Sequence, residues 1–236
     1  MVLYLLNQNE SIEETPFVYD SLLQSKLSLP FIESVYPTAN KAGIIKTDEE
    51  IHGVVLKGVD KEYDWNYIKS NLIYGDIPQY TDEVRSNDVV VSKIIADKML
   101  LNHGDDVRIW FVGEDMKTRG RKFTIKGIYE TGLTECDERF IYCDLNQIRR
   151  LNGWENDNVG HLEIKVTEGF DVNEANTFIY YSIPTSLVSF TADELYPQIF
   201  DWLELQDMNV VIIIVLMLVV AGITIISMLL IIVLER

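Results

Sequence analysis

Short apolar stretches separated by polar turns make up most of the chain, and many alternate apolar and polar positions as half-buried strands do. This pattern predicts strands at 2–6, 31–36, 43–46, 51–59, 88–91, 106–112, 122–130, 139–144, 161–166 and 186–191. Apolar residues that recur every three or four positions predict helices at 17–27, 61–72, 93–101, 146–151 and 172–181. Ser92 is predicted to cap the third of these helices, and Gly153 to end the fourth. Strands and helices are mixed along the chain, which indicates the α+β fold class.

A strand–helix–strand order occurs at both ends of this region. Two such units separated by a strand-rich middle predict a split ferredoxin-like lobe, formed by 1–60 and 155–195, with an inserted lobe at 60–155. A single mixed α+β domain without a separate inserted lobe is the alternative arrangement.

The pattern changes at Met208, because no side chain from there to Leu234 is charged. The apolar run of about 25 residues reaches roughly 37 Å as a helix, which exceeds the hydrocarbon thickness of about 30 Å. Core helices of soluble proteins rarely have more than about 14 wholly apolar residues. A transmembrane helix is therefore predicted at 208–234, in which Thr224 and Ser227 can bond to the preceding turn.

Small residues recur along this helix at Ala221, Thr224 and Ser227, with Gly222 beside them. Such residues allow a neighbouring helix to approach closely, which favours a helix-packing face inside a bundle. The alternative is that these positions face lipid.

An amphipathic connecting helix is predicted at 192–207, directly before the apolar run. Trp202 lies a few residues before the run, where an aromatic ring favours the headgroup layer. A helix that continues from the soluble part into the membrane would carry motion between them. The candidate mechanical junction comprises Trp202, Leu203, Leu205 and Asn209.

Charge is unevenly distributed: 37 acidic residues face 20 basic ones, a net charge of −17, and almost all of it precedes the apolar run. So acidic a chain is not expected to bind nucleic acid, which requires clustered Lys and Arg. The scarcity of basic residues fits an exported domain, with 1–207 facing the periplasm. The first ten residues lack the features of a signal peptide, so we expect a piece of a longer protein. A cytoplasmic domain with a tail anchor is the alternative.

No nucleophile elbow, P-loop or dinucleotide fingerprint occurs in the sequence, and we expect neither an enzyme nor a bound cofactor. His52, His103 and His161 are far apart, which predicts solvated or half-buried structural roles instead of a metal site. Cys136 and Cys143 could form a disulfide only in a hairpin of suitable register, and a free buried Cys143 is the alternative.

A basic cluster contrasts with the acidic chain: Lys117, Arg119, Arg121 and Lys122 lie within six residues, beside Gly120. A basic loop tip could contact an acidic partner or lipid headgroups. An ordinary solvated hairpin is the alternative.

Together these segments resemble a known family. The second transmembrane helix of the LolC/LolE–FtsX–MacB class of ABC transporter permeases is similar to DWLELQDMNVVIIIVLMLVVAGITIISMLLIIVLER. Extracytoplasmic segments of that family resemble GIIKTDEEIHGVVLKGVDKEYDW, NDVVVSKIIADKMLLNHGDDVRIWF and FTIKGIYETGLTECDERFIYCDLNQIRRL. The likeness covers nearly the whole chain and is greatest to LolC/LolE-type permeases of the Bacteroidetes kind.

The resemblance implies a MacB-like periplasmic core, with a Porter-like lobe at 1–60 and 155–195 and a Sabre-like lobe at 60–155. It implies location in the cell inner membrane, a second permease copy (homo- or heterodimer), and a cytoplasmic ATPase subunit that binds ATP and Mg²⁺ in place of this chain. The implied function is mechanotransmission, in which movement of the periplasmic lobes expels a lipoprotein or another substrate. A lipoprotein or another periplasmic protein is the implied partner on that side of the membrane. The segment Gly113–Lys122 occupies the place of a carrier-recruiting hook but lacks its proline-containing extension. An FtsX-like signalling permease and a single-pass anchored interaction module are the alternatives.

Overall fold

The computed structural model describes residues 2–7, 14–47, 50–81, 84–112, 118–195 and 197–235. The chain divides into two compact units, Met1–Thr191 and Ala192–Arg236, and each is described by itself.

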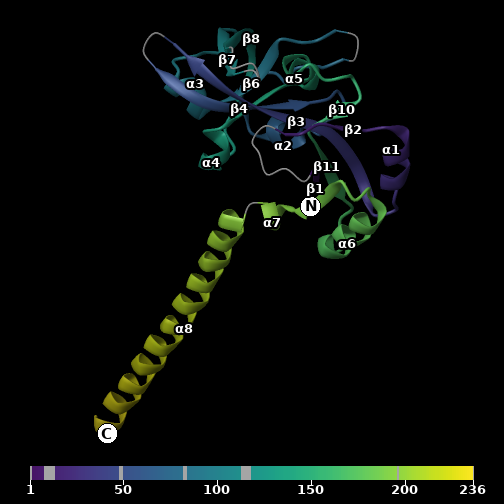
Figure 1. Cartoon of the computed structure of the whole chain (residues 1–236). Coiled ribbons are helices and arrows are strands. Elements are labelled where there is room, and N and C mark those ends of the chain that lie inside the picture. The colour runs from purple at the N-terminus through teal and green to yellow at the C-terminus, as the bar shows by residue number, and fades with distance from the viewer. Residues whose placement is uncertain are drawn as a thin grey trace. The chain divides into compact units, whose positions relative to one another are not determined.

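The first unit is built on a mixed sheet (Figure 1). Its strands are β1 (Val2–Asn7), β3 (Ile32–Lys46), β4 (Ile51–Val59), β5 (Leu72–Gly75), β6 (Asp88–Ser92), β7 (Asp106–Val112), β8 (Thr118–Tyr129), β9 (Phe140–Asp144), β11 (His161–Val166) and β12 (Leu187–Thr191). Their order is β12-β1-β11-β3-β4-β9-β6-β8-β5, and β7 pairs with β3 and β8. Only the β4–β9 and β6–β8 pairs among the described strands are parallel. Two further short strands, β2 (Phe17–Val18) and β10 (Asn158–Val159), pair with each other.

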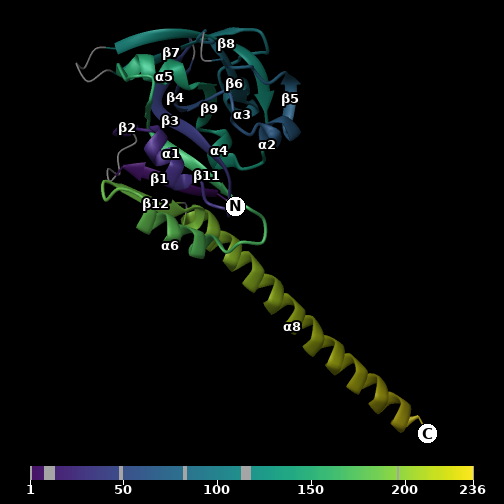
Figure 2. The same ribbon diagram turned by 90° about the vertical axis from the view of Figure 1, so that its right-hand side faces the viewer.

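Helices lie over both ends of the sheet, as Figures 1 and 2 show. They are α1 (Ser21–Leu27), α2 (Asn66–Ser70), α3 (Lys93–Lys98), α4 (Thr134–Asp137), α5 (Leu145–Asn152) and α6 (Val172–Ser182). Helices α1 and α6 lie beside β1, β11 and β12, whereas α3 and α5 lie toward β4, β6 and β8 (Figure 2).

Two large hydrophobic cores result from this arrangement, together with a smaller apolar cluster of Ile68, Val90 and Tyr129. The first core contains Leu3, Leu5, Leu162 and Ile164 together with apolar residues of α1 and α6. The second contains Leu56, Ile141 and Phe123 with apolar residues of α3 and α5.

Strand β3 belongs to both cores, because Val35 packs against the first and Ala39 lies in the second. Successive side chains of a strand point to opposite faces, so these odd-numbered positions share one face of the sheet. The even-numbered positions between and beside them, Tyr36, Thr38 and Asn40, therefore point to the opposite face.

The sequence located most elements but misjudged several boundaries. The predicted helix 93–101 ends at Lys98, and the predicted strand 122–130 begins at Thr118. Residues 31–36 and 43–46 were predicted as separate strands, yet they are one strand because β11 pairs with its first half and β4 with its second. The predicted helix 17–27 begins only at Ser21, where the Asp20 side chain accepts a hydrogen bond from the Leu23 N–H. The predicted helix 61–72 is reduced to α2, since Leu72 pairs with β8.

Two predicted helix boundaries are confirmed. The Ser92 side chain accepts a hydrogen bond from the Ile95 N–H at the start of α3. Gly153 ends α5 with φ of 69°, a left-handed conformation that a side chain disfavours.

The second unit is helical. Helix α7 (Ala192–Leu195) is followed by α8 (Pro197–Leu234), which is 38 residues long and continues without interruption through the predicted boundary at 207. Within the described residues, Met208–Leu234 is the one helical segment that is long and apolar enough to cross a membrane, and none of it is buried in the structure.

Candidate functional site

Four charged side chains meet in the interior of the first unit. Lys57 Nζ lies 2.6 Å from Glu163 Oε1, and His161 Nε2 lies 3.6 Å from that same oxygen. On the other side of the ring, His161 Nδ1 lies 2.8 Å from Glu14 Oε1. The exposed fraction of these side chains is between 4% and 15%. We call Glu14, His161, Glu163 and Lys57 the charge chain.

Strand register brings the charge chain together. His161 and Glu163 are two residues apart on β11 and therefore share a face. They lie opposite Thr38 and Tyr36 of β3, and Lys57 of β4 lies opposite Asn40 of β3. All of these positions lie on the sheet face opposite the two hydrophobic cores.

Glu14 comes from outside the sheet, from the irregular segment that leads into β2. Its carboxylate accepts hydrogen bonds from the Asn40 backbone N–H at 2.9 Å and from Asn40 Nδ2 at 3.0 Å. The polar contacts of Glu14 thus join this segment to β3 and β11.

Burial and charge oppose each other at each titratable group. Burial by itself lowers the pKa of His161, but the Glu14 carboxylate, with Glu163 beside it, raises the pKa to about 9. Burial would raise the pKa of Glu163, yet Lys57 and His161 lower it to about 2. The pKa of Lys57 is well above its usual range, because Glu163 outweighs the effect of burial. Lys57 and His161 are therefore positively charged and Glu163 negatively charged at neutral pH.

Aromatic side chains cover the lysine end of the charge chain. Tyr63 Oη accepts a hydrogen bond from Lys57 Nζ at 3.2 Å, and the Lys57 ammonium lies 5.3 Å and 5.5 Å from the ring centroids of Tyr63 and Tyr142. Tyr63 also makes edge-to-face contacts with Tyr36 and Trp65. These rings exclude water, which strengthens the attraction between Lys57 and Glu163.

The charge chain joins β4, β11 and the segment before β2 through ion pairs, which is a structural role. Each charged group faces an opposite charge, and the part of the chain that the structure describes holds no cluster of three His, Cys, Asp or Glu residues able to bind a metal. The isolated roles expected for the histidines hold for exposed His103, but the solvated or half-buried role is wrong for His161, of which only 3% is exposed. His52 Nε2 lies 2.8 Å from the Glu138 carbonyl oxygen. Cys136 and Cys143 are both free thiols, with Cys143 buried.

The basic cluster lies on the hairpin of β7 and β8. Lys117 lies outside the described residues. The expected loop tip at Gly120 is wrong, because Arg119, Gly120, Arg121 and Lys122 belong to strand β8 and pair with β7. Lys122 Nζ is 2.8 Å from Asp106 Oδ2 of β7, and both side chains are largely exposed.

An aromatic side chain lies across the same hairpin. Trp110 of β7 packs over Gly120 of β8, where an added Cβ would stand 3.0 Å from the indole ring. The Arg108 guanidinium lies 5.9 Å from the Trp110 ring centroid. Glycine at 120 therefore creates the space in which the indole lies.

The predicted junction and packing residues lie on α8. The side chains of Trp202 and Leu203 are outside the described residues, and Leu205 and Asn209 are exposed. Ala221, Thr224 and Ser227 are also exposed. The two hydroxyls donate to the Val220 and Ile223 carbonyl oxygens, each at 2.9 Å, as the sequence predicted.

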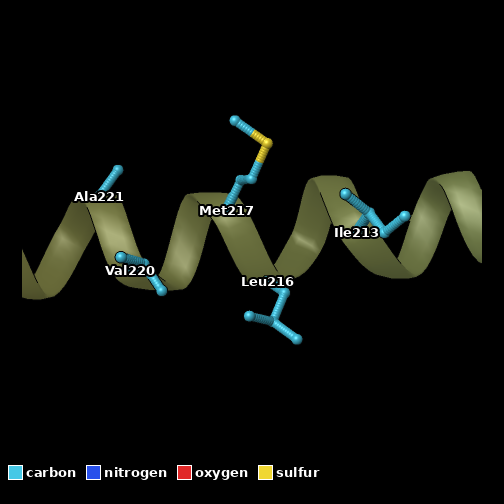
Figure 3. A pocket seen from close by; sticks show the side chains of 5 residues that line it. All are labelled: Ile213, Leu216, Met217, Val220 and Ala221. Atoms are coloured by element: carbon cyan, nitrogen blue, oxygen red, sulfur yellow. The ribbon is translucent and has the colours of Figure 1, made fainter.

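A shallow apolar hollow lies near the middle of the same helix (Figure 3). Its lining residues are Ile213, Leu216, Met217, Val220 and Ala221. They recur with helical spacing, and only Ala221 among them belongs to the predicted packing face.

Comparison with known proteins decides the family. The family model of the MacB-like periplasmic core domain matches residues 3–178. The chain belongs to this family. The match spans most of the first unit and ends within α6, before β12, and it confirms the mixed α+β fold class.

Solved structures share this MacB-like fold at low sequence identity. The periplasmic region of MacB from Actinobacillus actinomycetemcomitans is 13% identical, with a TM-score of 0.54, over 84% of this chain and 92% of that one. The extracellular domain of the noncanonic ABC-type transporter YknZ from Gram-positive bacteria is 14% identical, with a TM-score of 0.54, over 81% and 100% of the two chains. No curated protein sequence matches the chain.

The chain thus carries the extracytoplasmic domain of a MacB/FtsX-like ABC transporter permease, followed by a candidate membrane span. The resemblance identified from the sequence is confirmed at this level. The sequence analysis missed the charge chain. His161 and Glu163 alternate with apolar residues, and the same alternation is found in a strand with one solvent-exposed face. The one available signal was the number of tyrosines on the neighbouring strands, which favours a covered face.

Proposed function

We propose that the domain couples ATP hydrolysis by a cytoplasmic partner subunit to release of a lipoprotein from the inner membrane. In this proposal residues 1–207 face the periplasm, and a second permease copy completes the transporter. ATP and Mg²⁺ would be bound by the partner subunit.

The continuity of α8 carries this proposal. About three turns of the helix precede Met208, and the candidate span follows in the same helix. An uninterrupted helix resists bending, so a displacement of the span would move the residues before it. Those residues connect through α7 to β12, and β12 pairs with β1 along its length.

The lobes and partner surfaces are assigned within the same proposal. The core beneath α1 and α6 supports a Porter-like lobe from 1–60 and 155–195. We assign 60–155 to a Sabre-like lobe, whose core beneath α3 and α5 also takes in Ala39, Ile45, Val54 and Leu56 of β3 and β4. We assign the basic β8 residues Arg119, Arg121 and Lys122, together with Lys117, to contact with a periplasmic partner. Ala221, Gly222, Thr224 and Ser227 are assigned to helix packing within the transporter.

A break in α8 tests the coupling. In the permease that contains this chain, Leu205→Pro should reduce lipoprotein release at least tenfold, because proline removes a helical hydrogen bond and clashes with the preceding turn. Leu205→Ala is the matched control, since this side chain is 55% exposed and alanine favours helix. Release is measured from proteoliposomes, and ATPase assembly by co-purification.

Normal release by the Leu205→Pro permease would contradict mechanical coupling through this helix. A permease that shows ATP-dependent changes in its domain but releases no lipoprotein would favour the FtsX-like signalling alternative.

A further inference from the structure

We propose that Glu14, His161, Glu163 and Lys57 form a strut that holds the two hydrophobic cores as one rigid body, so that motion arriving at β12 and β1 reaches the far half of the domain. This inference rests on the proposed function. It makes the four side chains positioning residues for transport.

The location of the charge chain supports this role. Its members lie on β11 and β4, the two neighbours of β3, at the stretch of β3 between Val35 of the first core and Ala39 of the second. On that face, the charge chain and the ring contact between Tyr36 of β3 and Tyr63 connect the strands across the boundary.

Thr38 strengthens the same boundary. It is fully buried, and its hydroxyl donates to the His161 carbonyl oxygen at 3.1 Å. A strand boundary held by paired charges and directed hydrogen bonds tolerates little sliding, because each contact requires one register.

Alternation of sign makes the strut depend on every member. Lys57 and His161 are positive, and Glu163 and Glu14 are negative, so the chain of four is neutral. Removal of any one charge leaves an opposite charge buried without full compensation, which is strongly unfavourable.

Glu14 is the member that can be removed most cleanly. It lies in an irregular segment, so its substitution does not alter a strand. Its carboxylate lies against Gly160. A Cβ atom added at this glycine would overlap Glu14 Oε2 and lie 3.1 Å from Ala39 Cα. Gly160 is thus required for Glu14 to reach Asn40 and His161.

The structural test uses the full chain in detergent micelles. Hydrogen exchange is measured on β1, β11, β3, β4 and β9, and thermal unfolding by circular dichroism. We expect Glu14→Gln to increase exchange at β11 and β3 at least tenfold and to lower the unfolding midpoint by about 5 °C or more. In the wild type, the strands of the two cores should have similar protection from exchange. In the variant, the protection of one set of strands should differ from that of the other.

Two further variants keep the test decisive. Gly160→Ala leaves every charge in place but displaces Glu14, and it should reproduce the exchange pattern of Glu14→Gln. Lys165→Gln is the matched control on the same face of β11, because its pairs with Glu33 and Asp64 are more exposed than those of the charge chain. It should leave exchange at β3 unchanged.

The pH profile separates a strut from general destabilisation. Charged or titratable groups face His161 from Glu14 before β2, Glu163 of β11, Lys57 of β4 and Tyr4 of β1, with Tyr63 and Tyr142 beyond Lys57. Wild-type protection at β11 should fall as His161 loses its proton in alkali, after correction for intrinsic exchange. Glu14→Gln should move that fall to lower pH.

Unchanged exchange in both Glu14→Gln and Gly160→Ala would overturn the strut. Normal lipoprotein release by a Glu14→Gln permease with separated cores would overturn its role in transport. A wild-type permease without release would instead contradict the proposed function, and the exchange data would still decide whether the strut exists.

Discussion

Two lysine–carboxylate pairs of this domain have nearly the same length and different surroundings. Lys57 and Glu163 are 2.6 Å apart with 15% and 9% of their side chains exposed, whereas Lys122 and Asp106 are 2.8 Å apart with 63% and 48% exposed. The first pair reaches across β3 from β4 to β11, and the second joins the paired strands β7 and β8. The first is covered by tyrosines and continued by His161 and Glu14, and the second is in contact with water.

The difference shows that distance by itself says little about an ion pair. In water, the attraction between Lys122 and Asp106 is weakened by the solvent and by salt. In the interior, Lys57 and Glu163 have lost their hydration, so each needs the other. We therefore expect the buried pair to control folding and the exposed pair to be available for contact with a partner.

The largest effect is expected from Lys57→Met. Methionine approximates the shape of the lysine stem but leaves Glu163 with only His161 as a counter-charge, so the free energy of unfolding should fall by about 3–5 kcal/mol. The measurement is chemical denaturation of the full chain in micelles. Combining this change with Glu163→Leu should recover part of the loss, because the remaining His161 and Glu14 still pair. A double variant less stable than Lys57→Met would contradict the argument.

A smaller effect is expected from pH. The pKa of His161 is raised to about 9 in the folded state, so its contribution is complete below the unfolded pKa of about 6.5 and is lost as pH rises through 9. The pKa of Glu163 is lowered to about 2, so its contribution is complete above about 4.5 and is lost as pH falls toward 2. Stability should therefore be highest between about pH 4.5 and 6.5 and fall by about 3 kcal/mol at either extreme.

His161→Gln tests the alkaline limb. This variant should be less stable at pH 6, and its stability should change little between pH 6.5 and 9. His103→Gln is the control, since His103 is exposed and should retain the wild-type profile. An alkaline limb that persists in His161→Gln would assign it to another group.

The smallest effect on folding is expected from Lys122→Met. Because this side chain is in water, the unfolding midpoint of the variant should stay within experimental error of the wild type. Added salt should change the two midpoints equally. Folding would then not depend on the Lys122–Asp106 pair, which leaves Lys122 available for contact with a partner. A clear loss of stability would remove the contrast between the two pairs.

Local pattern was sufficient for much of the fold. The alternation of apolar residues in β4, β7 and β11 located these strands, and Ser92 and Gly153 marked helix ends through backbone chemistry that depends only on neighbours. The long uncharged run identified the candidate span for the same reason. Strand β3 was divided in two because its unity depends on partners more than a hundred residues away.

The evidence for function divides in the same way between local sequence and tertiary structure. The sequence by itself determined the acidic character of the domain, the apolar helix and the permease resemblance, since these depend on composition and on the order of segments. Only the tertiary structure decided that Lys57, His161, Glu163 and Glu14 meet, because strand order and register bring together residues from three distant segments. It also decided that their face of the sheet is covered. Burial turns four ordinary charges into a connected chain, and burial is a property of the folded neighbours of a residue.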